Sequence, residues 1–438
     1  MPDKVVLVVI DGLTPGLLEG ALDELPALRF LAEHGRYRRG TSVFPSLTPV
    51  CLSSIATGAH PDVHEIPHLV WYDRGEGRLV EYGSSFGAIV AAGFSRSLRD
   101  TIVNMNARHL GSGATTLFEA VDDAGLVPAC VNFTAYRGRT RHRPALPGVP
   151  PANGPRRFFF YNLYESDATG APLAVRNRAA GSVDDYAAAV GRWLVTRDGF
   201  DVLVFYLSDL DYASHAFGPD GCREALTRAD DHVGSLLAAA GGPDEFLERY
   251  AVVVCADHGQ THVDAVVSLE HHVAGVDGVV VAASNRAGQL YRLPGCAEDV
   301  RSLALRLDAE PAAEVVLFRE GGDVVARRAR EECRVRDGAV VAGDASLLAY
   351  PDAAARVWAA LANPNAGDVL VSAAEGYEFA DLAGRHHAGG GSHGSLVAGD
   401  SEVPILTVGL DAEPASIVDL APAVLAHLGI AVPVPKAA

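Results

Sequence analysis

The chain has 438 residues, of which 49% are hydrophobic and 21% charged, a composition typical of a folded globular protein. With 55 acidic and 36 basic residues, its formal net charge is -19, which argues against a protein that binds a nucleic-acid scaffold through bulk charge. The six cysteines include no C-x-x-C pair, so we expect them to be reduced and mostly buried.

The first apolar run covers residues 5–10 and ends at Asp11. Its continuous β-branched character predicts a strand buried on both faces of a parallel sheet. The run is too short to span a membrane, and no small-residue cleavage site follows it. We therefore expect no export signal, no membrane partner and a cytoplasmic location.

Residues 25–34 have a helical pattern. Residues 44–58 are expected to form a loop followed by a second helix. In the second helix, Thr48 is expected as the N-cap and Pro49 at the first helical position. A helix N-terminus favours an anion, including the alkoxide of a hydroxyl group. Ser46 is the competing hydroxyl, and taken alone the segment also fits a helix with no further role.

Residues 115–123 and 183–195 are expected to be helices, and the stretch between them is irregular in composition. Residues 134–182 are rich in Pro, Gly, Arg and Asn, with several arginines at 137–143. We expect an excursion over the surface, whose arginines could contact a distal phosphate or carboxylate of a substrate.

A second buried strand is predicted at residues 202–207, shortly before Asp211 and His215. An Asp and a His four residues apart can face one side of a turn and bind one metal ion, although a surface ion pair is the alternative. An amphipathic helix is expected next, at residues 223–240.

The third buried strand is predicted at residues 251–256 and ends at Asp257-His258. A buried carboxylate requires a partner. Because carboxyl ends of parallel strands meet at one sheet edge, we expect the three acidic strand ends to form a pocket. Alternating strands and helices predict a doubly wound α/β core with a mostly parallel sheet flanked by helices.

Residues 281–365 read as a separate unit, with a strand at 288–293, a helix at 297–307 and a hairpin that turns at Gly321-Gly322. We interpret this unit as a small α+β cap inserted into the core. The expected domains are therefore a catalytic core of residues 1–280 and 366–438, and a cap of residues 281–365.

The last motif, at residues 391–394, places His393 among glycines that allow a close backbone approach. Taken alone it also fits a flexible loop. Together, the strand ends, the hydroxyl at the helix start and this histidine would supply about the seven ligands that two divalent ions need. Two metals about 4 Å apart suit an in-line phosphoryl displacement.

The order of these motifs resembles the alkaline phosphatase superfamily, and within it the nucleotide pyrophosphatase/phosphodiesterase (type I phosphodiesterase) family. The motifs are Asp11, F-P-S-x-T at 44–48, D-x-x-x-H-x-x-G-P at 211–219, D-H-G at 257–259 and G-x-H-G at 391–394. The resemblance spans the core but neither the cap nor the Arg-rich excursion. It implies an alkaline phosphatase-like core with two divalent ions, zinc first and manganese or iron as alternatives.

The resemblance also implies roles for individual residues. One ion would be held by Asp11, Thr48, Asp257 and His258, and the other by Asp211, His215 and His393. Thr48 would be the nucleophile and form a covalent phospho-threonine. Tyr206 corresponds to a tyrosine of the leaving-group pocket, and His64 to a structural histidine.

The chain departs from the family pattern after the nucleophile, where an aromatic residue and then Pro-Asn are usual but Pro49-Val50-Cys51 stands here. Cys51 leaves open which group donates to a phosphoryl oxygen, and Asn132 or an arginine at 137–143 could fill that role. The missing aromatic residue removes half of a base-stacking clamp, so nucleotide specificity stays open.

Other histidines are weaker candidates. Prolines interrupt the spacing of His60, His64 and His68, which argues against a metal-binding helix face there. His262 could substitute as a ligand because it lies four residues after His258. His386 and His387 could lie near the site because they precede His393.

The sequence thus predicts a metal-dependent phosphohydrolase that cleaves a phosphodiester or pyrophosphate bond of a small anionic substrate through Thr48. The alternatives are a phosphonate C–P hydrolase similar to phosphonoacetate hydrolase, a phosphomonoesterase, and a metal-binding protein without catalysis. A sulfatase is disfavoured because the chain has no C-x-P-x-R motif. The oligomeric state is left open.

Overall fold

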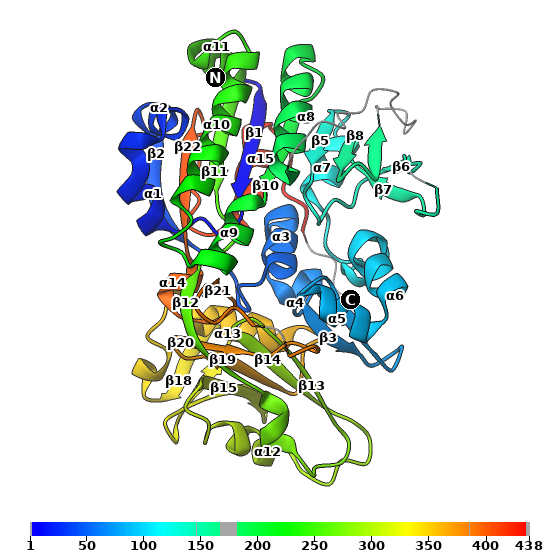
Figure 1. The fold of residues 1–438 in the computed structure, drawn as a ribbon, viewed down its shortest axis with the longest axis vertical. Helices are drawn as coiled ribbons and strands as arrows, with labels where there is room; N and C mark the ends of the chain where they lie inside the picture. Colours follow the sequence, from blue (N-terminus) through cyan, green and yellow to red (C-terminus); the bar gives the residue numbers. More distant parts are fainter. Residues whose placement is uncertain (1, 146, 167–181, 385, 435–438) are drawn as a thin grey trace.

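The computed structural model describes residues 2–145, 147–166, 182–384 and 386–434. Its largest sheet has eight strands in the order β2-β22-β11-β1-β10-β5-β8-β9 (Figure 1). The strands are β1 (Lys4–Ile10), β2 (Arg36–Thr41), β5 (Pro128–Val131), β8 (Arg157–Phe160), β9 (Tyr164–Ser166), β10 (Val202–Leu207), β11 (Tyr250–Cys255) and β22 (Glu402–Val408). The five strands from β11 to β8 are parallel, and β22, β2 and β9 pair antiparallel at the edges.

The three predicted apolar runs form β11, β1 and β10, which are neighbours at the centre of this sheet. Every residue of β10 and β11 is buried, so helices must cover both faces. In one group of helices, α10 (Arg223–Ala239) contacts both α2 (Pro26–His34) and α8 (Val183–Arg197). In another group, α3 (Thr48–Thr57), α7 (Leu117–Asp123) and α15 (Leu420–His427) contact one another. The predicted doubly wound, mostly parallel α/β core is confirmed.

The Arg-rich stretch is not wholly a surface excursion. Its residues 157–160 and 164–166 form β8 and β9 at one edge of the large sheet, where the three phenylalanines of β8 are buried. A separate hairpin is formed by β6 (Thr140–His142) and β7 (Ala152–Gly154). Residues 167–181 of the predicted excursion lie outside the described residues.

A second, antiparallel sheet has seven strands in the order β13-β14-β19-β15-β16-β17-β18. They are β13 (Val279–Ser284), β14 (Ala287–Arg292), β15 (Ala313–Glu320), β16 (Asp323–Arg328), β17 (Glu331–Arg336), β18 (Ala339–Gly343) and β19 (Val369–Ala373). The predicted turn at Gly321-Gly322 joins β15 to β16. The sheet takes in residues on both sides of 281–365, because β13 begins at Val279 and β19 follows residue 365.

Two helices cover the two faces of the second sheet. Val315 and Leu317 of β15 pack in one cluster with α13 (Ala353–Ala362), whereas Val316 and Phe318 pack in another with α12 (Val300–Leu307). Because neighbouring residues of a strand face opposite sides, α12 and α13 lie on opposite faces. The second sheet thus has its own core on each side.

The two sheets are joined by a buried ion pair. Arg286, in the turn between β13 and β14, places its Nε 3.3 Å from Oδ2 of Asp400 in α14 (Ala398–Ser401), and neither side chain is exposed. The backbone N–H of Arg286 also donates to the carbonyl of His393 at 2.9 Å. The turn of the second sheet is therefore fixed against the carboxyl edge of the first.

Further elements surround this junction. They are α1 (Pro15–Ala21), α4 (Pro61–His64), β3 (Val70–Asp73), β4 (Arg78–Glu81), α5 (Phe86–Ala92), α6 (Phe94–Arg99), the π-helix η2 (Asp100–His109), α9 (Asp209–Phe217), α11 (Pro243–Arg249), β12 (Thr261–Val267), β20 (Gly376–Phe379) and β21 (Gly391–Ser392), with short 3-10 turns η1 (Leu22–Glu24), η3 (Leu269–Val273), η4 (Ala345–Leu348) and η5 (Ile417–Asp419). None of the described helices is long and apolar enough to cross a membrane.

All six cysteines are free and buried, as predicted for reduced thiols. Four are spread over the two sheets and their helices: Cys51 in α3, Cys130 in β5, Cys255 in β11 and Cys333 in β17. Burial raises the pKa of each of these four thiols.

Candidate active site

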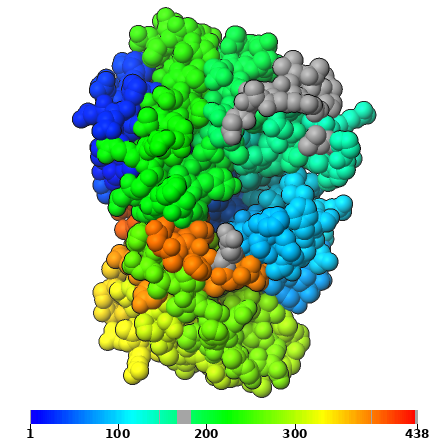
Figure 2. Space-filling model, in the orientation of Figure 1, coloured from blue at the N-terminus to red at the C-terminus, as the bar shows by residue number. Residues whose placement is uncertain are grey.

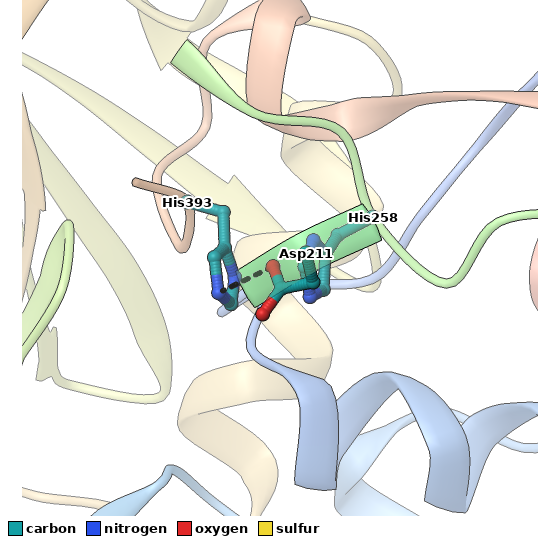
Figure 3. A group of neighbouring side chains, drawn as sticks. All are labelled: Asp211, His258 and His393. Atoms are coloured by element: carbon teal, nitrogen blue, oxygen red, sulfur yellow. Dashed lines mark ion pairs between the residues drawn. The ribbon is translucent and has the colours of Figure 1, made fainter. Parts of the chain in front are cut away.

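The central parallel strands place three carboxylates at their carboxyl ends. Asp11 directly follows β1, Asp257 comes two residues after β11, and Asp211 lies in the first turn of α9 after β10. His258 is adjacent to Asp257, and His393 directly follows β21. Figure 3 shows Asp211 and His393 facing each other, with His258 beside them. The three acidic strand ends therefore meet at one edge of the sheet, as predicted, although they come from segments far apart in the sequence.

The candidate ligands form one connected cluster. Among the described residues, two groups have ligand atoms within 4.8 Å of one another: Asp11, Asp257 and His258, and Asp211, His258 and His393. Oγ1 of Thr48 lies 3.1 Å from Nε2 of His258. Nε2 of His215 lies 3.3 Å from Oδ2 of Asp211. All of the predicted metal ligands are thus brought together.

The three histidines present the same face to the cluster. Nδ1 of each donates to a backbone carbonyl: His215 to Gly391 at 2.8 Å, His258 to Gly259 at 3.0 Å and His393 to Ser46 at 2.8 Å. Each imidazole therefore has a proton on Nδ1 and turns Nε2 towards the carboxylates. A backbone partner on the other ring nitrogen is the usual arrangement of a metal-binding histidine.

Within the cluster, two buried carboxylate oxygens have no hydrogen-bond partner among the described residues: Oδ1 of Asp11 and Oδ2 of Asp257. Both carboxylates are close to Nε2 of His258, at 3.3 Å and 3.4 Å. Burying unpartnered carboxylate oxygens is costly unless a cation compensates them. These oxygens and the inward-facing imidazole nitrogens fit divalent cations of the first transition row, whose ligands are carboxylate and imidazole.

The electrostatics of the cluster also favour a bound cation. Burial, then the charges of Asp257 and Asp211, raise the pKa of Asp11 far above its usual value. Burial also raises the pKa of Asp257. Burial would raise the pKa of Asp211 as well, but His215, His393 and His258 together more than offset burial, and the pKa of Asp211 is lowered. Without added positive charge, the carboxylates of Asp11 and Asp257 resist ionisation together.

Thr48 is the first residue of α3 and not its N-cap, which corrects the predicted position by one residue. Leu47 has the extended conformation of an N-cap, and its carbonyl accepts hydrogen bonds from the N–H groups of Val50 and Cys51. The expected end of the helix is confirmed, because Gly58 adopts the left-handed conformation with φ of 63°. The hydroxyl of Thr48 still lies at the positive end of the helix, beside His258.

Glycines allow the segment around His393 to approach the cluster, as the sequence predicts. A Cβ atom at Gly391 would lie 2.5 Å from Oε1 of Gln260, and one at Gly394, whose φ is 122°, would lie 2.9 Å from Leu47. Gln260 was not singled out from the sequence, although its Nε2 donates to the carboxylate of Asp211. Gln260 therefore helps to orient one of the candidate ligands.

The predicted substrate-binding residues separate into two kinds. Tyr206 lines the site, and its hydroxyl donates to the carboxylate of Asp11. Cys51 is fully buried with its Sγ 3.2 Å from Oγ of Ser42. Asn132 accepts from the N–H of Tyr161 at 2.9 Å and donates to the carbonyl of Val183 at 3.3 Å. Neither Cys51 nor Asn132 lines the cavity, because both side chains are engaged inside the fold.

Two of the four arginines at 137–143, proposed for the same role, are engaged elsewhere. Arg137 pairs with Glu119 at 3.2 Å, and Arg139 pairs with both Glu119 and Asp123 at 2.8 Å. Neither arginine lines the cavity at the cluster. A contact of these two side chains with a substrate phosphate would require both to leave their carboxylate partners.

The cluster opens into a cavity of about 520 Å³, which lies where Figure 2 shows the face hollowed between the green and light-blue segments. One side of the cavity is polar and contains candidate ligands and Thr48. The other side is formed by residues of α5, α6 and η2. A cavity of this size accommodates a small molecule.

Asn285 is a cavity residue that the sequence analysis missed. It lies in the turn between β13 and β14 with φ of 56°, and its Nδ2 is 3.0 Å from Nε2 of His393. Asparagine tolerates this left-handed conformation better than most residues. An asparagine in a turn is so common that nothing in the sequence marks it as functional.

The other histidines take different positions. His387 lines the cavity and stacks on His215 with ring centroids 4.1 Å apart, as its place before His393 suggests. His262 has a side chain 54% exposed and pairs with Asp264, away from the cluster. His64 is buried and bonded to Ser54 at 3.0 Å, in keeping with a structural role. His60 and His68 do not line the cavity.

This fold, with carboxylates, imidazoles and a hydroxyl at one sheet edge, places the chain among alkaline phosphatase-like proteins. A profile of the type I phosphodiesterase/nucleotide pyrophosphatase family matches residues 5–396, and the chain belongs to that family. Family membership and the candidate metal groups support a metal-dependent hydrolase of phosphate esters. A search of curated proteins found no match.

Solved structures share the fold over nearly the whole chain. Phosphonoacetate hydrolase from Sinorhizobium meliloti 1021, in complex with phosphonoformate, is 21% identical with a TM-score of 0.64, over 97% of this chain and 95% of that one. Human ectonucleotide pyrophosphatase/phosphodiesterase 5 is 14% identical with a TM-score of 0.65, over 99% and 97% of the two chains. The murine protein of the same name has a TM-score of 0.64 at 14% identity, over 99% and 97%. At these identities, the likeness shows the fold.

Proposed function

We propose that the protein is a phosphodiesterase that cleaves a phosphodiester or pyrophosphate bond of a small substrate, with Thr48 as nucleophile. The observation that carries the proposal is the position of the Thr48 hydroxyl, 3.1 Å from Nε2 of His258 at the start of α3 and on the wall of the cavity. Asp11, Thr48, Asp257 and His258 would hold one divalent ion, and Asp211, His215 and His393 a second. Zinc is our first choice of metal, with manganese or iron as alternatives.

Bound divalent ions would offset the charge of the phosphoryl oxygens and lower the pKa of the attacking hydroxyl. The remaining steps take place on Thr48 itself. Thr48 loses its proton, and its oxygen forms a bond to phosphorus while the bond to the leaving oxygen breaks. The leaving oxygen then takes a proton. Attack of water on phosphorus in a second step breaks the phospho-threonine bond and restores the hydroxyl.

Under the same proposal, residues 281–365 act as a cap, and the turn of β13 and β14 supplies the missing donor to a phosphoryl oxygen. Asn285 lines the cavity together with Thr48 and places an amide nitrogen beside His393. It would take the role that the family gives to an asparagine where this chain has Cys51. Hydrogen-bond donors aimed at developing charge stabilise the transition state.

The test is hydrolysis of bis-p-nitrophenyl phosphate, p-nitrophenyl phosphate and phosphonoacetate by the purified protein, before and after chelation and after restoration of zinc. We expect a preference for the diester that chelation abolishes and zinc restores. A preference for the monoester would indicate a phosphomonoesterase, and turnover of phosphonoacetate a C–P hydrolase. Bound metal without turnover of any of the three would indicate a metal-binding protein without catalysis.

A further inference from the structure

The wall of the cavity that faces the candidate ligands is apolar. It is formed by Leu69 and by four apolar side chains from the consecutive helices α5, α6 and η2, which are Ile89, Leu98, Ile102 and Met105, with Thr101 of η2 as the polar exception. Tyrosines and a phenylalanine from other segments continue this surface: Tyr82, Tyr161, Tyr212 and Phe160. A group attached to a phosphoryl centre at Thr48 would therefore meet hydrocarbon and aromatic surface as it extends away from the ligands.

The same cavity offers little to a second anionic group. No arginine or lysine is among the described residues that line it. Beyond the metal ligands, the lining reaches towards Ser84 and His387, where Glu378 and Asp381 line an adjoining pocket and His387 already pairs with the carboxylate of Glu378 at 3.0 Å. A carboxylate or a further phosphate there would lose its hydration without gaining a cationic partner.

The helices that line the cavity also expose apolar side chains to solvent. Phe86, Val90 and Phe94 of α5 and α6 are 71%, 52% and 52% exposed, and the rings of Phe86 and Phe94 meet edge-on with centroids 6.3 Å apart. Tyr212 of α9, which lines the cavity, is 65% exposed. Exposed apolar side chains gathered in one place mark a binding surface more often than scattered ones do. Here Phe86, Val90 and Phe94 lie on the same two helices as Ile89 and Leu98 of the apolar wall.

We propose that the substrate carries, on its phosphoryl group, an uncharged apolar arm of alkyl or aryl character that binds along α5, α6 and η2. This inference rests on the proposed function, because it needs the phosphoryl group to sit at Thr48. It assigns the substrate to apolar phosphodiesters. Phosphonocarboxylates and compounds with several phosphates are disfavoured, because their second anion would face the apolar wall.

Three p-nitrophenyl phosphodiesters test the inference, with methyl, octyl or carboxymethyl as the second ester group. The leaving group is the same in all three, so differences in kcat/KM report how the second group binds. Each buried methylene contributes to binding, so we expect the octyl ester to exceed the methyl ester by about tenfold or more in kcat/KM. We expect the kcat/KM of the carboxymethyl ester to be lower than that of the methyl ester.

A matched pair of variants locates the effect. Leu98 in α6 lines the cavity and is 45% exposed, whereas Leu305 in α12 is 44% exposed and does not line it. Leu98→Lys should reduce the ratio of octyl to methyl kcat/KM at least about threefold. It should also raise the kcat/KM of the carboxymethyl ester relative to that of the methyl ester. Leu305→Lys should leave both ratios unchanged, since it places the same charge on a distant helix.

The outcomes separate this inference from the proposed function. If the methyl ester is hydrolysed in a chelator-sensitive reaction but the octyl ester is no better, or the carboxymethyl ester is preferred, the apolar arm is wrong and the phosphodiesterase stands. Equal ratios in the Leu98→Lys and Leu305→Lys proteins would also overturn the apolar arm. If the metal-loaded protein hydrolyses none of the three diesters, both proposals fail.

Discussion

The two sheets contribute to the site in different ways. The eight-stranded sheet delivers Asp11, Asp211 and Asp257 simply because parallel strands end at one edge. The seven-stranded antiparallel sheet reaches the same cavity through one turn, where Asn285 faces His393 and Arg286 pairs with Asp400. The positions of the three carboxylates follow from the strand order of the first sheet, whereas the position of Asn285 follows from the contact between the two sheets. We therefore expect catalysis to depend mainly on residues of the first sheet, and the precise geometry of the site to depend on the second.

The largest effect should come from Thr48→Ala, on the side of the eight-stranded sheet. Removal of the nucleophile is expected to lower kcat for the diester by about 10⁴-fold or more. The carboxylate and imidazole ligands remain, so metal content measured by elemental analysis should persist. Ser46→Ala is the control, because that hydroxyl donates to the carbonyl of Ser395 at 3.1 Å and does not line the cavity. Loss of activity in Ser46→Ala with retention in Thr48→Ala would reverse the assignment.

The next largest effect should come from the junction of the sheets. Arg286→Met leaves the carboxylate of Asp400 buried without its cation and should lower the free energy of unfolding by about 3–5 kcal/mol. Denaturant unfolding monitored by circular dichroism measures this change. Arg306→Met is the matched control: its pair with Glu298 has side chains 43% and 24% exposed. Removing that surface pair should lower the free energy of unfolding far less, because solvent screens exposed charges. Equal losses in the two variants would show that the junction is not a stabilising contact.

A third effect concerns Glu81 in β4, beside the second sheet. Burial raises the pKa of Glu81 to about 7 from 4.5, although the N–H groups of Gly83 and Ser84 donate to it. Between these values the unfolded chain releases the proton and the folded chain keeps it, so stability falls as pH rises. The wild type should lose about 3 kcal/mol relative to Glu81→Gln from pH 4.5 to pH 7.

Denaturant unfolding of both proteins across this pH range measures the difference. Glu224→Gln is the control, because the Glu224 side chain is 89% exposed and the substitution should leave the pH profile as it is in the wild type. A constant difference between wild type and Glu81→Gln at all pH values would contradict the expectation. It would mean that Glu81 ionises alike in the folded and unfolded chains.

The smallest effect should come from the turn of the second sheet. Asn285→Ala removes one donor and is expected to lower kcat by about 10- to 100-fold, with metal content unchanged. Asn132→Gly is the control, since it keeps the left-handed backbone at φ of 58° and removes an amide that does not line the cavity. That variant should lose stability and keep kcat at temperatures where it is folded. A fall in kcat confined to Asn132→Gly would return the donor role to Asn132.

Much of the large sheet could be predicted from the sequence. The continuous apolar runs define β1, β10 and β11 almost to the residue, because strands buried on both faces exclude polar side chains. The place of β22 between β2 and β11 could not be predicted, since the pairing joins segments far apart in the chain. Strand β19 is also fully buried and, apart from Ser372, apolar, so its composition does not reveal which sheet it joins.

The clustering of the candidate ligands could be predicted because residue type and spacing carry metal chemistry, and because most of these residues lie at or shortly after the end of a strand. Asn285 and Gln260 could not be predicted, since their importance comes from what they contact and not from the residues next to them. Nor did the sequence indicate the apolar wall. Its residues come from short helices and a π-helix, whose spacing departs from a regular helical repeat.

The burial of every cysteine turns the thiols into reporters of unfolding. A thiol reagent in solution should label none of them quickly in the native protein, because only the exposed thiolate reacts. Cys255 lies in the large sheet and Cys333 in the second sheet. If the second sheet opens by itself, Cys333 will be modified before Cys255, and peptide mass analysis during labelling will show that order. If the two sheets unfold as one unit, both thiols will be modified at the same rate.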